Sequence, residues 1–129
     1  MGSKQTKYEK PDLTGKTVII TGATTGVGRS LAAFIASYNP KKLILAVRNR
    51  AKGEATLEFI ETRNGHSNNV EVWDMDLADL KSVKSFAEKF IKEVGELHLL
   101  FNNAGSAPME LMKIKNTKNN FEVTFQNTD

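Results

Sequence analysis

The chain has 129 residues, 40% of them hydrophobic, which suits one globular domain with a core of its own. It contains no cysteine, and this excludes a disulfide framework, a thiolate metal site and a cysteine nucleophile. The formal charge of +3, from 18 basic and 15 acidic residues, is too small to indicate nucleic-acid binding by itself. Because His66 and His98 are the only histidines, we expect no metal site.

Residues 1–12 are polar, with Pro11 near their end, and we expect them to form a disordered tail. Their opening, "MGSKQT", fits the pattern for N-myristoylation of Gly2, although so loose a pattern also occurs in unmodified chains. No apolar run approaches the ~20 residues of a membrane span, and none has the character of a signal-peptide core. We therefore expect a cytoplasmic domain, with lipidation at Gly2 as an open alternative.

Residues 13–129 are expected to form a single domain that begins with a strand and a helix. "KTVIIT" (residues 16–21) is rich in β-branched residues and predicts a buried strand. After a glycine-rich segment, four bulky residues have the spacing of one helix face, and Pro40 ends that helix. These residues are Leu31, Phe34, Ile35 and Tyr38. "KLILAV" (residues 42–47) predicts a second buried strand.

Two further helix patterns and a third strand follow. Residues 51–63 carry helix-forming residues, with Gly65 as the stop, and "NVEVWDMDL" (residues 69–77) predicts the strand. The strongest helix pattern spans residues 79–94 and ends at Gly95. Its apolar stripe consists of Leu80, Val83, Phe86, Ala87, Phe90, Ile91 and Val94.

The C-terminal part begins with "LHLLF" (residues 97–101), which predicts a fourth buried strand. Residues 106–120 are expected to form a polar loop, and "FEVTFQ" (residues 121–126) to begin another helix. The order of the elements is therefore βαβαβαβ. Apolar strands that alternate with amphipathic helices form parallel sheets covered on both faces. Right-handed crossovers favour the strand order 3-2-1-4, the first half of a doubly wound, Rossmann-like α/β fold.

The glycine-rich segment joins the first strand to the first helix at the carboxyl edge of the predicted sheet, where folds of this kind bind ligands. The free N–H groups of a helix N-terminus carry partial positive charge, which suits a pyrophosphate. Glycine lets such a group approach the backbone, and Thr24 and Thr25 add hydroxyl groups. The spacing of Gly22, Gly26 and Gly28 matches neither the Gly-x-Gly-x-x-Gly fingerprint nor a P-loop, so a tight turn without a ligand stays an alternative.

Three motifs in this order resemble those of the short-chain dehydrogenases/reductases: "TGATTGVG" (residues 21–28), "DMDLAD" (residues 74–79) and "NNAG" (residues 102–105). The resemblance covers about residues 13–126, and "AVRNRAKGE" and "NNFEVTFQ" are similar to a subgroup of retinol-dehydrogenase-like and WW-domain-oxidoreductase-like enzymes. It implies an oxidoreductase that uses a nicotinamide dinucleotide. The cofactor contacts it implies are Gly22, Thr24, Thr25, Gly26, Val27, Gly28, Arg48, Asn49, Asp76, Leu77, Asn103, Ala104 and Gly105.

The second and third motifs also have purely structural interpretations. Asp76 ends the third strand, where its carboxylate can accept from an adenine amino group, cap the helix that begins near Asp79, or do both. Asn102 and Asn103 end the fourth strand, where their side-chain amides can tie the strand ends and meet a ribose, the alternative being ordinary turn chemistry. Gly105 either lets the backbone pass near the cofactor or is a simple loop glycine.

The end of the second strand indicates which dinucleotide is bound. An acidic residue ~20 positions after the glycines usually holds a ribose 2′-hydroxyl. Arg48 stands at that place, 20 residues after Gly28, and the next carboxylate is that of Glu54. A guanidinium there attracts a 2′-phosphate, with Arg29 or Arg50 able to assist. We therefore expect NADP(H) rather than NAD(H), the alternative being that these arginines are solvated surface charges.

We expect no catalytic group within these residues. In the family that the chain resembles, a tyrosine with a lysine one helical turn later, and a serine, act on the carbonyl from segments that follow the fourth strand. Tyr38 and Lys42 have that spacing, but Pro40 between them prevents a shared helix face. Strands beyond residue 129 would pair with the fourth strand, so its edge is predicted to be open and liable to self-association.

Two hypotheses remain. In the first, the chain is the NADP(H)-binding half of a short-chain oxidoreductase whose complete form takes a small hydrophobic alcohol or carbonyl compound. In the second, it is a non-catalytic, truncated or vestigial module that holds a dinucleotide or a partner. Nucleic-acid binding has only the charge of +3 in its support. An assay separates the first two hypotheses: NADPH binding without turnover supports the second, and turnover supports the first.

Overall fold

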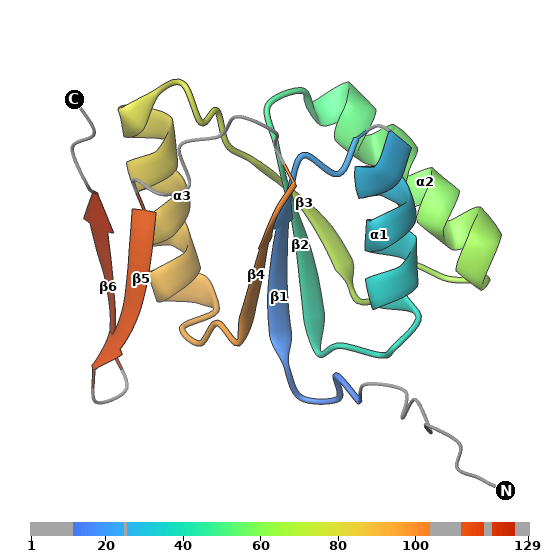
Figure 1. The fold of residues 1–129 in the computed structure, drawn as a ribbon, viewed down its shortest axis with the longest axis horizontal. Coiled ribbons are helices and arrows are strands. Elements are labelled where there is room, and N and C mark those ends of the chain that lie inside the picture. Colours follow the sequence, from blue (N-terminus) through green and yellow to red (C-terminus); the bar gives the residue numbers. More distant parts are fainter. Residues whose placement is uncertain (1–11, 25, 104–111, 118–119, 126–129) are drawn as a thin grey trace, which may run out of the picture.

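A computed structural model describes residues 12–24, 26–103, 112–117 and 120–125 (Figure 1). Its strands and helices alternate up to residue 102, as predicted. They are β1 (Thr17–Thr21), α1 (Gly26–Ala36), β2 (Lys42–Val47), α2 (Arg50–Asn64), β3 (Val70–Asp74), α3 (Leu80–Glu93) and β4 (Leu99–Asn102). These strands form a 4-stranded parallel sheet in the order β3-β2-β1-β4. The predicted Rossmann-like α/β fold and its strand order are confirmed.

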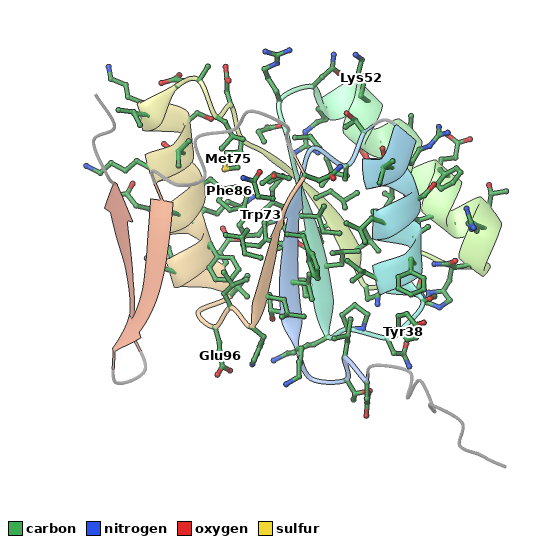
Figure 2. All side chains as sticks on the ribbon, viewed as in Figure 1. Tyr38, Lys52, Trp73, Met75, Phe86 and Glu96 are labelled. Atoms are coloured by element: carbon green, nitrogen blue, oxygen red, sulfur yellow. The ribbon has the colours of Figure 1, made fainter. Side chains whose placement is uncertain are left out.

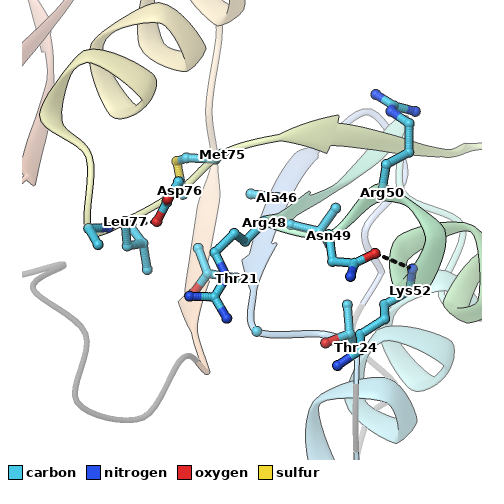
Figure 3. A pocket seen from close by; sticks show the side chains of 13 residues that line it. Thr21, Thr24, Ala46, Arg48, Asn49, Arg50, Lys52, Met75, Asp76 and Leu77 are labelled. Atoms are coloured by element: carbon cyan, nitrogen blue, oxygen red, sulfur yellow. Dashed lines mark hydrogen bonds between the residues drawn. The ribbon is translucent and has the colours of Figure 1, made fainter.

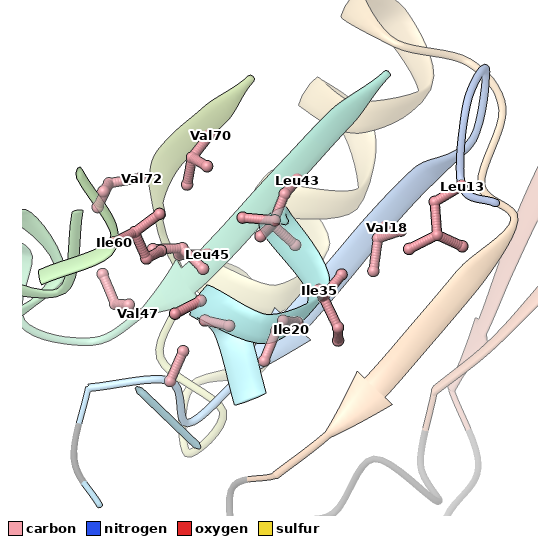
Figure 4. Packing of buried hydrophobic residues seen from close by; sticks show 14 residues of the cluster. Leu13, Val18, Ile20, Ile35, Leu43, Leu45, Val47, Ile60, Val70 and Val72 are labelled. Carbon is pink, nitrogen blue, oxygen red and sulfur yellow. The ribbon is translucent and has the colours of Figure 1, made fainter. Parts of the chain in front are cut away.

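The sheet is covered by α1 and α2 on one face and by α3 on the other (Figure 1). Alternate residues of β1 serve the two layers, because Val18 and Ile20 belong to the cluster under α1 and α2, whereas Ile19 belongs to the cluster under α3. Figure 4 shows the first of these clusters. Burying each such side chain contributes about 1.5–3 kcal/mol. Both faces of the central strands are therefore apolar, and the carboxyl ends of β1, β2 and β3 are held together at one edge.

The buried side of α1 differs in part from the predicted one. The helix packs on the sheet through Gly28, Ala32, Ala33, Ile35 and Ala36. Phe34 is 55% exposed, and Tyr38 lies beyond the helix end, edge-on to Phe34 with ring centroids 4.8 Å apart. The prediction is confirmed for Ile35, which is buried, and for Leu31 and Tyr38, which pack against the same cluster. It is wrong for Phe34, because the small residues Gly28, Ala32, Ala33 and Ala36 let the helix approach the sheet closely.

The ends of α2 and α3 follow their sequence signals, but the apolar stripe of α3 is narrower than predicted. Gly65 ends α2 with a φ of 90°, and its N–H donates to Glu61 O. Asp79 caps α3 by accepting from the Lys81 N–H. The residues of α3 that reach the core are Val83, Phe86, Ala87 and Phe90. Leu80 and Ile91 are 60% and 38% exposed, because they lie at the margins of the face that meets the sheet.

Two predictions for residues 106–126 are wrong. β5 (Met112–Thr117) falls in the predicted polar loop, and β6 (Asn120–Phe125) stands where a helix was expected. The two strands pair antiparallel as a separate sheet, and β6 lies beside α3 (Figure 1). Residues 120–125 form a strand because Phe121, Val123 and Phe125 alternate with polar residues, and this alternation is the period of a strand and not of a helix.

Some expectations fall on parts of the chain that the structure does not describe. Residues 1–11 of the expected tail, with the myristoylation pattern at Gly2, lie outside the described residues, as do residues 106–111 and 118–119 of the loop and residue 126 of the expected helix. Among the helices of the described part, none combines the length and apolar character needed to cross a membrane. The cytoplasmic location stays a prediction.

Candidate functional site

The turn between β1 and α1 needs glycine at several positions, for different reasons. We call it the glycine turn (residues 22–24 and 26–28). Gly22 and Gly26 have φ angles of 66° and 49°, in the region that favours glycine. At Gly28 the reason is space, because an added Cβ would collide with the Gly22 carbonyl oxygen and the Asn103 side-chain amide. Gly28 is therefore needed for the turn to pack on itself, and its role in the access of a ligand stays a prediction.

The end of β4 supports the glycine turn through its two asparagines. The Thr21 hydroxyl donates to Asn102 Oδ1 at 2.9 Å, which ties the ends of β1 and β4 together. The Asn103 amide Nδ2 donates to Gly22 O at 3.2 Å. These bonds confirm that the asparagine amides tie the strand ends together, and a contact of Asn103 with a ribose stays a prediction. Ala104 and Gly105, the rest of the motif, lie outside the described residues.

A cavity of about 850 Å³ opens at the carboxyl edge of the sheet, over the ends of β1, β2 and β3 (Figure 3). Several predicted cofactor contacts line it together: Gly22, Thr24, Arg48, Asn49, Asp76 and Leu77. Gly26, Val27, Gly28 and Asn103 are not among its lining residues, and Val27 is 78% exposed. Thr25 lies outside the described residues. Six of the 13 residues that line the cavity were thus predicted from motifs that are distant in sequence.

Sequence reasoning missed several residues of the cavity wall, of which Lys52 matters most. Lys52 lies three residues after the α2 cap, Asn49, whose Oδ1 accepts from the Lys52 N–H at 3.1 Å. Helical side chains lean toward the helix N-terminus, so a lysine at this place reaches back over the cap. The position of a lysine three residues after the helix cap could therefore have predicted, from the sequence, that Lys52 lines the cavity. Ala46 and Met75, which also line the cavity, are buried core residues without a motif.

The basic residues near the cavity differ in their partners. Arg50 Nε lies 3.3 Å from Asp74 Oδ1, and its NH2 group donates to Val72 O at 3.1 Å. Arg29 stacks on the Phe59 ring at 4.3 Å and does not line the cavity. Arg29 is therefore not placed as the assistant that the sequence suggested, whereas Arg50 lines the cavity but is paired with Asp74. Arg48 is exposed and lines the cavity, and within the described part of the chain no hydrogen bond or ion pair engages its side chain.

Asp76 holds the turn that leads into α3. Its Oδ1 accepts from the Ala78 N–H at 3.0 Å, and its own N–H donates to the Ser82 hydroxyl at 2.8 Å. The helix cap is Asp79, so the interpretation of Asp76 as the cap is wrong: the helix begins one residue after Asp79, too far along for Asp76. Asp76 is the one carboxylate among the cavity-lining residues of the described chain.

An open parallel sheet with a glycine turn and a cavity at its carboxyl edge defines a doubly wound α/β protein of the nucleotide-binding type. The family model described as short chain dehydrogenase matches residues 16–128, and the chain belongs to this family of oxidoreductases, which use a nicotinamide dinucleotide. A short-chain dehydrogenase/reductase of Armillaria gallica is 38% identical over 124 residues, 95% of this chain and 38% of that protein. Human retinol dehydrogenase 12 is 43% identical over 93 residues, 72% of this chain and 29% of that one.

Solved structures agree with this assignment. A citronellol catabolism dehydrogenase from Pseudomonas aeruginosa PAO1 is 31% identical, with a TM-score of 0.64 over 79% of this chain and 41% of that one. A short chain dehydrogenase from Escherichia coli CFT073, complexed with NADPH, is 26% identical, with a TM-score of 0.63 over 75% of this chain and 40% of that one. The chain spans between 30% and 38% of the length of the first curated relatives that it matches.

Proposed function

We propose that the chain is the NADP(H)-binding half of a short-chain oxidoreductase that acts on a small hydrophobic alcohol or carbonyl compound. The observation that carries the choice of dinucleotide is Arg48. Its guanidinium lines the cavity from the end of β2, where a carboxylate would hold a 2′-hydroxyl, and it has no ion-pair partner among the described residues. A guanidinium in this state favours a 2′-phosphate, and an absent carboxylate removes repulsion.

The rest of the cavity suits the adenosine end of a dinucleotide. Leu77 is half-buried, and Asp76 Oδ2 accepts no hydrogen bond from the residues that the structure describes, so together they offer an apolar surface and an acceptor to a purine. The glycine turn, with Thr24 on the cavity wall, offers backbone N–H groups at the start of α1 to the pyrophosphate. When bound, the nicotinamide supplies the hydride that is exchanged with the substrate. Contacts from Thr25, Ala104 and Gly105 stay predictions.

A second candidate function, dinucleotide binding without turnover, is favoured by the position of Tyr38. Its carbonyl accepts from the Leu13 N–H at 3.3 Å, at the amino edge of the sheet. Figure 2 shows Tyr38 and Lys52 at opposite edges of the molecule. Lys42, four residues after Tyr38, pairs with Glu71 at 2.9 Å. This pair therefore cannot act as the proton donor of a reaction at the cavity, and Tyr8, the other tyrosine, lies outside the described residues.

Binding and turnover assays test both candidates. Fluorescence titration with NADPH and NADH should give tighter binding of NADPH. Arg48→Ala should weaken NADPH about 10-fold, since one charge-assisted contact is worth about 1.5 kcal/mol at an exposed site, and change NADH less than about twofold. Arg63→Ala, on the far part of α2 and stacked on Phe59 at 5.9 Å, is the matched control and should change neither. An equal loss for both coenzymes on Arg48→Ala would remove the argument for NADP(H).

The same samples decide between an enzyme half and a binding module. Reduction of aldehydes and ketones with NADPH is measured against a blank without protein. NADPH binding without turnover supports the second candidate, and turnover above the blank supports an active oxidoreductase in this chain alone.

A further inference from the structure

Thr56 is a buried polar residue of α2 that belongs to none of the motifs of the chain, and it contacts the glycine turn. The residue is only 1% exposed. Its hydroxyl Oγ1 donates to Ala23 O at 3.2 Å, and it also lies 3.1 Å from Lys52 O in its own helix. Helical threonine hydroxyls often bond to the carbonyl four residues back. The bond to Ala23 O is therefore the one that depends on how α2 packs against the turn.

The carbonyl group of Ala23 depends on this hydroxyl. Ala23 is 0% exposed, so water does not reach its carbonyl oxygen. Among the residues that the structure describes, Thr56 Oγ1 is the donor that satisfies this oxygen. A buried carbonyl without a hydrogen bond is costly in free energy. The hydroxyl therefore fixes the direction in which the Ala23 carbonyl points.

The direction of the Ala23 carbonyl also sets that of the following N–H, which belongs to Thr24. The described part of the chain contains no cis peptide bond, and the C=O and N–H of a trans peptide point in opposite directions. Because Ala23 O points at α2, the Thr24 N–H points away from α2. Thr24 lines the cavity, and no hydrogen bond to another described residue engages its N–H.

A backbone N–H that is held in one direction binds a phosphate oxygen without losing conformational freedom in the process. Rotation of the Ala23–Thr24 peptide would exchange this donor for a carbonyl oxygen, which repels a phosphate. We propose that Thr56 is a positioning residue for the pyrophosphate of the dinucleotide. Its hydroxyl holds the Ala23 carbonyl toward α2 and thereby presents the Thr24 N–H to the ligand. This proposal rests on the proposed function.

Replacing Thr56 with valine removes the hydroxyl and keeps the shape of the side chain. Thr56→Val should weaken NADPH, NADH and ADP-ribose about 5-fold, the equivalent of one hydrogen bond of about 1 kcal/mol, because all three carry the pyrophosphate. Adenosine 2′-monophosphate lacks the pyrophosphate and should change less than about twofold. Thr56→Ser keeps a hydroxyl and should bind ADP-ribose like the parent chain. Thr62→Val, at an exposed position of the same helix, is the matched control and should change no affinity.

A second measurement follows the Thr24 N–H directly. In amide NMR spectra, ADP-ribose should shift the Thr24 signal in the parent chain and in Thr56→Ser, and shift it less in Thr56→Val. A Thr24 signal that ADP-ribose leaves unchanged in the parent chain would refute the inference, whether or not Thr56→Val folds. Circular dichroism checks that each variant is folded at the temperature of the titrations.

The outcomes separate this inference from the proposed function. If Thr56→Val lowers the free energy of unfolding but keeps the parent's affinity for ADP-ribose, the inference is refuted and the proposed function stands. If it weakens adenosine 2′-monophosphate as much as ADP-ribose, the hydroxyl supports the cavity as a whole and the inference is also refuted. If the parent chain binds NADPH and NADH equally, the choice of NADP(H) fails and this inference stands. If it binds neither, both fail.

Discussion

Replacing Gly28 with alanine perturbs the contact on which the geometry of the glycine turn depends. The new Cβ would meet the Gly22 carbonyl oxygen and the Asn103 amide. The first of these is backbone, so it cannot rotate away, and the hydrogen bond of 3.2 Å from Asn103 Nδ2 to Gly22 O would also be strained. Either α1 moves away from β1 or the turn opens.

The expected size of the effect follows from three contributions. Overpacking costs about 1–3 kcal/mol, and loss of the Asn103 bond about 0.5–1.5 kcal/mol. Alanine is the better helix former by about 1 kcal/mol, which offsets part of this cost because Gly28 lies within α1. We therefore expect Gly28→Ala to lower the free energy of unfolding by about 1–3 kcal/mol, and the melting temperature by about 5–15 °C.

Urea and thermal unfolding, followed by circular dichroism and by the fluorescence of Trp73, measure this change. Ser30→Ala, at an exposed position of the same helix, is the control for helix propensity and should be neutral or slightly stabilising. Gly28→Ala should also weaken NADPH and NADH to the same degree, because both share the pyrophosphate. A Gly28→Ala chain as stable as the parent would refute the contact between α1 and the β1 turn.

Three further predictions concern contacts outside the cavity. His98 Nδ1 accepts from the Thr17 N–H at 2.9 Å, so His98→Ala should lower the free energy of unfolding in urea by about 1–3 kcal/mol. His98→Asn keeps an acceptor and should lower it less, and equal losses for the two variants would contradict this role. Burial raises the pKa of Glu71, but the hydrogen bonds from Lys42 and from the Trp73 ring outweigh it, and the pKa is lowered from 4.5. The stabilisation by this carboxylate, below about 1 kcal/mol because the side chain is 44% exposed, is present at neutral pH and lost as the pH falls through the lowered pKa. The difference in urea midpoint between the parent and Glu71→Gln should therefore shrink as the pH is lowered below 4.5, and a difference that does not change with pH would argue against the pair. β4 stands at the edge of the described sheet, and its apolar residues are only half-buried, so the chain is predicted to self-associate through this edge. Analytical ultracentrifugation should show an average mass that rises with protein concentration, and a monomer at every concentration would refute this prediction.

Much of the site was predictable because its residues belong to local patterns. Gly22 and Arg48 each follow a buried strand directly, Asp76 follows β3 by two residues, and parallel strands bring their carboxyl ends to one edge. The partners of these residues were not predictable. That Arg50 is occupied by Asp74, and that Asn103 is occupied by Gly22 O, depends on contacts between segments 24 or 81 residues apart in the chain.

The amino-acid sequence by itself determined the order of strands and helices, the strand order of the sheet, the helix stop at Gly65 and the place of the glycine turn. Each of these depends on the residue types within a few neighbouring positions and on the handedness of crossovers. Only the tertiary structure decided that α1 buries its alanines rather than Phe34, and that residues 120–125 pair as a strand. It also decided which cations face the cavity unpaired, because packing and ion pairing depend on which distant surfaces meet.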